Sequence, residues 1–173
     1  MLDYLHILAF GIYPYVAIAI FLLGSLVRFE REQYSWKSGS SQLLRRRQLR
    51  IGSNLFHIGI LFLMLGHTVG LLTPHFVYEQ VITASQKQML AIIAGGVAGS
   101  LCFVGLTMLL HRRLYDPRIR ATSSVADIAI LAMLWVQLVL GLLSIPFSLG
   151  HRDGHVMMQL SHWAQHIVTL QFD

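Results

Sequence analysis

The sequence predicts an all-α protein, a polytopic bundle of membrane-spanning helices. Hydrophobic residues make up 55% of its 173 residues, charged residues make up only 12%, and the mean hydropathy is +0.61. Four apolar runs are each long enough to cross a hydrocarbon layer, which takes about 20 helical residues. Because the backbone must satisfy its own hydrogen bonds in lipid, each run is predicted to be a helix.

The four expected spans belong to a single membrane domain that covers residues 1–173. No basic segment or small-residue cleavage site accompanies the first run, so we expect a retained span rather than a signal peptide. The residues after the fourth run, 148–173, are too polar to span and are expected to form an extracytoplasmic tail. The spans are expected at about residues 5–27, 51–72, 89–110 and 125–147.

The basic residues indicate how the chain crosses the membrane. Eleven of the thirteen lysines and arginines fall in two segments between spans, 28–50 and 112–120. An excess of such residues marks the cytoplasmic side, so the N-terminus and the tail are expected outside. The basic residues do not run along a face with interleaved aromatic residues, so the net charge of +5 favours topology over nucleic-acid binding. The single cysteine, Cys102, is expected to pack within its span.

Two histidines lie within the second apolar run, His57 and His67. An imidazole buried in hydrocarbon costs free energy unless something binds it. Ten residues of helix separate the two by about 15 Å in depth and roughly 80° in direction, so one metal ion cannot use both. Two haems could each take one imidazole as an axial ligand. The alternative is a pair of histidines that only pack and form hydrogen bonds with neighbouring helices.

Small residues accompany the two histidines. Gly59, Gly66 and Gly70 remove side chains beside or one turn away from them, which would leave room for a flat macrocycle. With this span running from inside to outside, His57 would serve the haem nearer the cytoplasm and His67 the outer haem.

The chain resembles the gamma subunit of the membrane-bound respiratory nitrate reductase, a cytochrome b. The resemblance runs from about residue 12 to residue 172. The matching motifs include Ile12-Tyr-Pro-Tyr15, Ser53-Asn-Leu-Phe-His57, Gly66-His67, Leu72-Thr-Pro-His75, Ala94-Gly-Gly96, Arg112-Arg-Leu114, Leu142-Leu-Ser-Ile-Pro-Phe-Ser148 and Trp163-Ala-Gln165.

The resemblance implies a function and a location. The second helix of the family supplies one axial histidine to each of two b-type haems, and these positions match His57 and His67. The family implies that quinol is oxidised at the outer haem, and that electrons pass inward to an iron–sulfur beta subunit and a molybdenum alpha subunit in the cytoplasm. It also implies a multi-pass protein of the bacterial cytoplasmic membrane.

The family fold has five membrane helices, of which this sequence contains four. The fifth carries the opposing axial histidine of both haems, so we expect the sequence to be a fragment or a truncated product. The rival interpretation is therefore a haem-deficient membrane anchor that recruits the cytoplasmic enzyme. A small transporter is a weaker alternative, because such proteins place ionisable groups along a path on several spans.

Residues at the ends of the spans are further candidates. Gly70 and Lys87 lie at the outer ends of the second and third spans, where the quinol would bind; Lys87 matches a family position associated with the quinol pocket. A lysine there could instead snorkel to the interface. Arg112 and Arg113, at the inner end of the third span, are candidates to hold haem propionates, or are topology determinants solvated at the headgroups.

Overall fold

The protein is built from helices. The computed structural model describes residues 2–35, 44–151 and 153–171, and no strand occurs among them. The elements are α1 (Leu2–His6), the π-helix η1 (Ile7–Ile12), α2 (Tyr13–Arg31), the 3-10 turn η2 (Gln33–Ser35), α3 (Arg46–Leu72), α4 (His75–Tyr78), α5 (Ala84–Tyr115), α6 (Pro117–Ala121), α7 (Val125–Gly150) and α8 (His155–Thr169).

Four helical stretches in the described part of the chain are long and apolar enough to cross a membrane. They contain the predicted spans, so the predicted all-α membrane class is confirmed. The chain divides into two compact units. One comprises residues 1–38 and 162–173, and the other comprises residues 39–161. The stretches are Tyr4–Arg31, Arg46–Leu72, Ala84–Tyr115 and Val125–Gly150.

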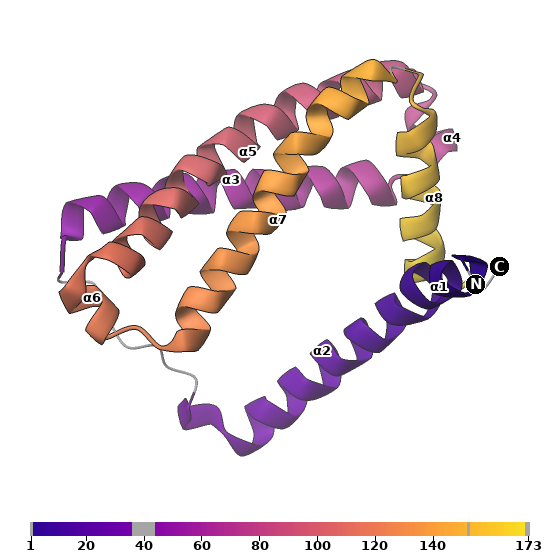
Figure 1. Cartoon of the computed structure of the whole chain (residues 1–173). Coiled ribbons are helices and arrows are strands. Elements are labelled where there is room, and N and C mark those ends of the chain that lie inside the picture. Colours follow the sequence, from indigo (N-terminus) through magenta and orange to yellow (C-terminus); the bar gives the residue numbers. More distant parts are fainter. Residues whose placement is uncertain (1, 36–43, 152, 172–173) are drawn as a thin grey trace. The chain divides into compact units, whose positions relative to one another are not determined.

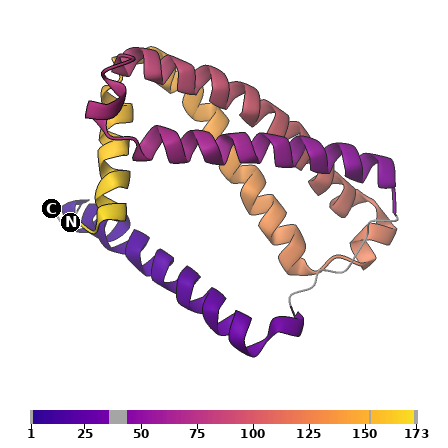
Figure 2. The same ribbon diagram turned by 180° about the vertical axis from the view of Figure 1, so that it is seen from behind.

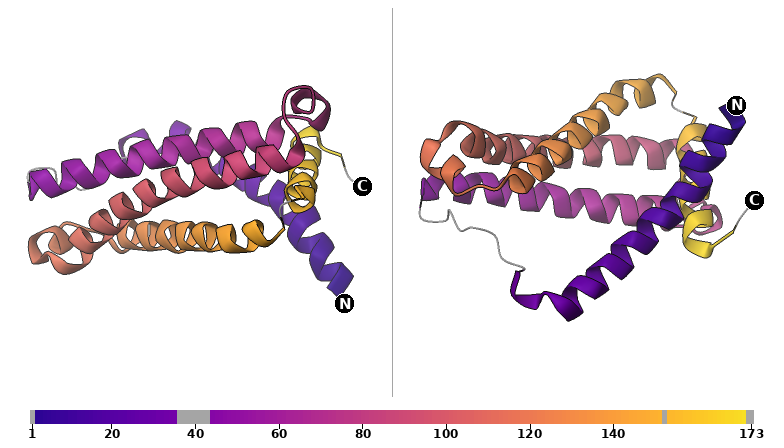
Figure 3. Two further views of the ribbon diagram at one scale, coloured as in Figure 1. Left: turned by 90° about the horizontal axis from the view of Figure 1, so that it is seen from above. Right: turned by 60° about the horizontal axis from the view of Figure 1, so that its bottom comes forward.

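The larger unit is organised around α3 and α5, which run antiparallel and side by side (Figures 1 and 3). Seen from behind, α3 lies in front and α7 on the far side (Figure 2). The buried apolar side chains Cys102 and Leu106 are each only 1% exposed. Both belong to α5, so the core lies along this helix, and the predicted packing role of Cys102 is confirmed.

Glycines bring the backbones of α3 and α5 into direct contact. A Cβ atom added at Gly59 would lie 2.6 Å from the backbone nitrogen of Cys102 and 2.7 Å from the carbonyl oxygen of Ala98. A Cβ atom at Gly105 would collide with the backbone nitrogen of Phe56 and lie 2.7 Å from the carbonyl oxygen of Gly52. Only glycine permits this approach, which membrane helices use because lipid supplies little hydrophobic driving force between them. We call these two positions the glycine contact.

The helix α7 packs on a different stretch of α5. The indole Nε1 of Trp135 donates a hydrogen bond to the hydroxyl of Thr107 (3.0 Å), and the ring of Trp135 lies 5.7 Å from that of Phe103. Gly99 faces Leu142, whose Cδ2 would lie 2.8 Å from an added Cβ. The polar ends of side chains on these two helices therefore find partners across the interface.

One amide side chain joins three segments at the start of α5. The Nε2 of Gln88 donates to the carbonyls of Ser148 (3.0 Å) and His151 (2.7 Å), and its Oε1 accepts from the backbone N–H of Gly154 (2.9 Å). Gln88 is only 7% exposed, so these bonds satisfy a buried polar group. Gly154 has φ +78°, a conformation that favours glycine, and it packs against Ala84. This side chain therefore fixes the end of α7 and the turn into α8 against the start of α5.

In the smaller unit, Pro14 explains an irregular turn of helix. Proline has no N–H, so the carbonyl of Phe10 lacks the donor that a regular helix would supply four residues later. The wider π-turn of η1 lies directly before the proline and gives its ring room. The indole Nε1 of Trp163 donates to the carbonyl of Phe10 instead (2.8 Å), with the two aromatic rings edge to face. The motifs around Pro14 and Trp163 are thus joined by one hydrogen bond.

The glycine contact predicts a large difference between two substitutions on the same helix. Gly105→Ala should lower the free energy of unfolding by about 1–3 kcal/mol, the usual cost of overpacking a tight site. Gly95→Ala is the matched control, because nothing lies within 4 Å of its added Cβ, and it should not destabilise the protein. Thermal unfolding in detergent micelles measures both. Equal losses at the two positions would contradict the assigned contact.

The bond between Trp163 and Phe10 predicts non-additivity. Trp163→Phe leaves the Phe10 carbonyl without its donor and should cost about 1–3 kcal/mol of stability. In a Pro14→Ala background, residue 14 supplies a backbone N–H to that carbonyl, so the same Trp163 substitution should cost clearly less. A double-mutant cycle of unfolding free energies measures the difference. An identical cost in both backgrounds would mean that the proline does not create the need for the indole.

Candidate functional site

The two candidate ligand histidines have the same local geometry on α3. The Nδ1 of His57 lies 2.7 Å from the carbonyl oxygen of Ser53 and 3.2 Å from its hydroxyl. The Nδ1 of His67 lies 2.7 Å from the carbonyl oxygen of Leu63. A carbonyl oxygen only accepts, so Nδ1 carries the proton in both rings and Nε2 keeps its lone pair. Histidines that bind metals show this pattern, with one nitrogen donating to a carbonyl and the other on the metal.

The glycines near the two histidines do not all leave open space. Cβ atoms at Gly66 and Gly70 would meet nothing within 4 Å, so both positions leave open space near His67. Gly59, expected to make room beside His57, lies instead in the glycine contact with α5. The reason is geometric, since Gly59 faces the neighbouring helix. The imidazoles of His57 and His67 themselves are exposed.

The histidines act singly in the part of the chain that the structure describes. No group of three or more histidine, cysteine or carboxylate side chains that could hold a metal ion occurs among those residues. Whether His57 and His67 each bind one haem iron therefore remains a prediction.

Lys87 lies in the first turn of α5. Since α3 and α5 are antiparallel, it lies at the same end of the pair as His67 and Gly70 (Figure 1). The residue is only 8% exposed, and its Nζ sits 3.7 Å from the ring centroid of Tyr78. Its Nζ makes no hydrogen bond to any other described residue. The ammonium is therefore held against an aromatic ring instead of extending into open space as a snorkelling lysine does.

Arg112 and Arg113 lie at the opposite end of α5. The Nη2 of Arg112 donates to the carbonyl of Leu44 (2.7 Å), and this arginine is 3% exposed. The Nη1 of Arg113 donates to the hydroxyl of Ser123 (2.9 Å) and lies 3.6 Å from the carboxylate of Asp127. Both guanidinium groups thus link the end of α5 to the segments before α3 and at the start of α7. We call this end of the larger unit the basic end.

Arg45 and Asp116 add an ion pair at this basic end. The Nε of Arg45 lies 2.6 Å from the carboxylate of Asp116. The other oxygen of Asp116 accepts from the backbone N–H of Arg118 (3.0 Å) and caps α6. The start of α3 is thereby tied to the turn that follows α5.

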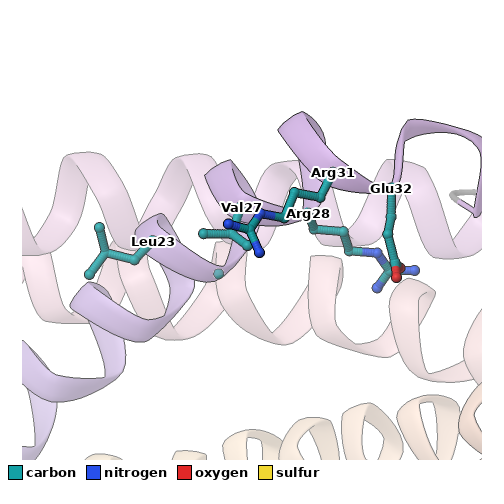
Figure 4. Close-up of a pocket in the computed structure, with 6 residues that line it drawn as sticks. Leu23, Val27, Arg28, Arg31 and Glu32 are labelled. Carbon is teal, nitrogen blue, oxygen red and sulfur yellow. The ribbon is translucent and has the colours of Figure 1, made fainter.

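A pocket in the smaller unit has no part in this site. It lies along the last turns of α2, and its lining residues come from that helix and from Glu32, the residue directly after it (Figure 4). Apolar side chains form one part of it and charged side chains the other. Its lining contains neither an imidazole nor any of the predicted site residues. The lining residues are Leu23, Gly24, Val27, Arg28, Arg31 and Glu32.

Two residues of the site escape sequence reasoning, Tyr78 and Gln88. Tyr78 lies in the short helix α4 between two spans, where an aromatic residue usually indicates only the membrane interface. Gln88 directly follows Lys87. A polar pair at the start of an apolar run is the one sequence signal that could have indicated it. Their partners lie in other segments of the chain, so the pattern alone does not reveal their contacts.

The fold defines a class: an all-helical protein with four helical stretches suited to crossing a membrane. The model of the nitrate reductase gamma subunit family matches residues 6–173. The chain belongs to this family, and it is therefore a membrane subunit of an oxidoreductase complex.

Relatives from two bacteria support the assignment. The respiratory nitrate reductase 1 gamma chain of Escherichia coli K12 is 51% identical over 168 residues, which cover 97% of this chain and 75% of the relative. The respiratory nitrate reductase 2 gamma chain of the same organism is 46% identical over 171 residues, 99% of this chain and 76% of the relative. The nitrate reductase gamma chain of Bacillus subtilis is 35% identical over 164 residues, 94% and 74% of the two chains.

Proposed function

We propose that this chain is the dihaem cytochrome b subunit of a respiratory nitrate reductase. It takes electrons from quinol at the outer face of the membrane and delivers them to an iron–sulfur beta subunit and a molybdenum alpha subunit in the cytoplasm. The observation that carries the proposal is the shared orientation of His57 and His67, whose Nδ1 atoms are bound to backbone carbonyls and whose Nε2 atoms keep their lone pairs.

The residues present suit two b-type haems. His57 and His67 would each hold one iron through Nε2, and the carbonyls of Ser53 and Leu63 would fix the ring orientation and raise the basicity of the ligand nitrogen. Gly66 and Gly70 leave open space beside His67. When bound, the haems would supply one-electron transfer along α3.

Arg113 is the better candidate of the two arginines for a haem propionate. A guanidinium carries five N–H donors in a planar fork, and its recorded contacts with Ser123 and Asp127 use one nitrogen. Arg112 is more deeply buried and is bound to the carbonyl of Leu44.

The quinol is proposed to bind where the outer end of α3 meets the start of α5. A quinol site needs an apolar slot and a hydrogen-bond donor for a ring oxygen. Gly70 leaves space in this region, and the Lys87 ammonium has donors that no described residue uses. Donation from this buried cation would hold the oxygen that gains negative charge as the quinol loses its proton.

The orientation follows from the basic segments. With segments 28–50 and 112–120 in the cytoplasm, the N-terminus and the tail 148–173 lie outside, in one membrane domain. A periplasmic reporter fused at Gly39, which lies outside the described residues, should be inactive, and a cytoplasmic reporter there should be active. The reverse pattern would overturn the proposed direction of electron flow.

The ligand assignment predicts the loss of one haem signal per substitution. His57→Ala and His67→Ala, made in the complete complex, should each remove one b-type absorption signal because the iron loses an axial imidazole. His155→Ala, at an exposed position on α8, is the control and should leave both signals. If both α3 variants kept two unchanged haems, the assignment would be wrong. If the unmodified complex held no haem in this subunit, the chain would instead be a membrane anchor.

The quinol site predicts a selective defect. Lys87→Met keeps the length of the side chain and removes the charge, so quinol-driven nitrate reduction should fall by about 10²-fold, the loss expected from one buried charged donor. Nitrate reduction by an artificial donor that feeds the cytoplasmic subunits directly should be unchanged. Ser85→Ala, on an exposed neighbour, is the control. A parallel fall of both activities would point to faulty assembly instead.

A further inference from the structure

A row of side chains leads from Lys87 in α5 to Tyr78 and His75 in the short helix α4 and to Glu79, the residue that follows α4. The ammonium of Lys87 lies against the ring of Tyr78, and the ring of His75 meets the same tyrosine edge to face, with 5.0 Å between centroids. The Nδ1 of His75 lies 3.0 Å from a carboxylate oxygen of Glu79. Lys87 is buried, the side chain of His75 is 34% exposed and that of Glu79 is 64% exposed. Exposure therefore rises steadily along the row.

His75 is the member of this row whose neutral ring offers a nitrogen lone pair as a proton acceptor. A lysine ammonium donates but has no acceptor while it is charged. Burial, and secondly the Glu79 carboxylate, raise the pKa of the Tyr78 phenol, so this group stays protonated. In neutral His75, the Nδ1 proton is directed at Glu79, which leaves the Nε2 lone pair as the acceptor. A carboxylate that orients an imidazole in this way also stabilises the imidazolium that forms.

We propose that His75 is the proton acceptor for quinol oxidation and that Glu79 is the positioning residue that orients it. The inference rests on the proposed quinol site at Lys87. Each quinol loses two electrons and two protons as its two O–H bonds break and a quinone leaves. A b-type haem held by His67, the oxidant under the proposed function, would accept the electrons one at a time. The protons go in succession to Nε2 of His75 and from there to water on the outer side.

The geometry favours this route over direct release at Lys87. The buried Lys87 ammonium makes no hydrogen bond to another described residue. The side chains of His75 and Glu79, in and directly after α4, are partly exposed to solvent. The ring of Tyr78 contacts both Lys87 and His75, so the imidazole lies one side chain away from the proposed quinol site. General-base catalysis of this kind contributes about 10²–10⁴-fold to a rate.

The test uses the complete nitrate reductase complex in vesicles, with menadiol as electron donor. His75→Gln removes the acceptor, Glu79→Gln removes the orienting charge, and His155→Gln is a matched control at another exposed histidine. A pH-sensitive dye in the outer medium follows proton release, and binding of a fluorescent hydroxyquinoline, a non-oxidisable analogue of the quinol ring, reports the quinol site itself.

We expect His75→Gln to slow proton release by about 10²-fold and to give a larger solvent deuterium isotope effect than the wild type. Added imidazole should restore the rate. Glu79→Gln should show a smaller loss of the same kind, and both variants should bind the hydroxyquinoline as tightly as the wild type. A merely structural role of the pair would weaken that binding and would not be rescued by imidazole.

Two other results would overturn the inference in different ways. If Lys87→Met loses hydroxyquinoline binding but His75→Gln releases protons at the wild-type rate and with the wild-type isotope effect, the quinol site stands and the proton acceptor is wrong. If Lys87→Met binds the hydroxyquinoline as tightly as the wild type, the proposed quinol site is wrong and the inference about His75 falls with it.

Discussion

The glycine contact between α3 and α5 is the constraint on which the larger unit depends. At Gly59 and Gly105 the backbones of the two helices meet without intervening side chains, so their register is set by atoms that cannot change rotamer. That register places the C-terminal end of α3, which carries His67, beside the start of α5, which carries Lys87. His57 faces away from the contact, because it lies two residues before Gly59 and about 200° around the helix from it. One interface therefore both holds the pair together and leaves the imidazoles on an open face.

Buried polar groups elsewhere in the chain are satisfied by partners distant in sequence. Gln88 bonds to three backbone groups more than fifty residues away, and Trp163 bonds to the carbonyl that Pro14 leaves without a donor. In lipid an unsatisfied backbone group costs several kcal/mol, so these side chains stabilise the irregular parts of the fold. Lys87 is an exception among the described residues, since its buried ammonium has an aromatic neighbour but no hydrogen bond to a described residue, and the Oγ of Ser161 is another. The unused donors of the Lys87 ammonium make it a candidate binding residue under the proposed function.

The two ends of the larger unit have different chemical characters. At the basic end, Arg45 and Arg113 pair with Asp116 and Asp127, and Arg112 and Arg113 also donate to Leu44 and Ser123, so these contacts fix the turns. At the other end, the row from Lys87 to Glu79 runs from a buried cation to an exposed carboxylate through groups that exchange protons. Under the proposed function, protons and electrons would leave quinol at one end and only electrons would reach the other, which suits this asymmetry.

The sequence by itself determined the membrane class, the four spans and the position of the two candidate ligand histidines on one helix. These features depend on hydropathy and helical spacing, which act over neighbouring residues. Only the tertiary structure decided that Gly59 serves helix packing, that Tyr78 covers Lys87, that Gln88 joins three segments and that Trp163 bonds to Phe10. Each of these contacts depends on which distant segment packs alongside. An apolar run says little about its packing partner, because most lipid-compatible helix faces are alike. Small residues and polar side chains determine which helices pack together.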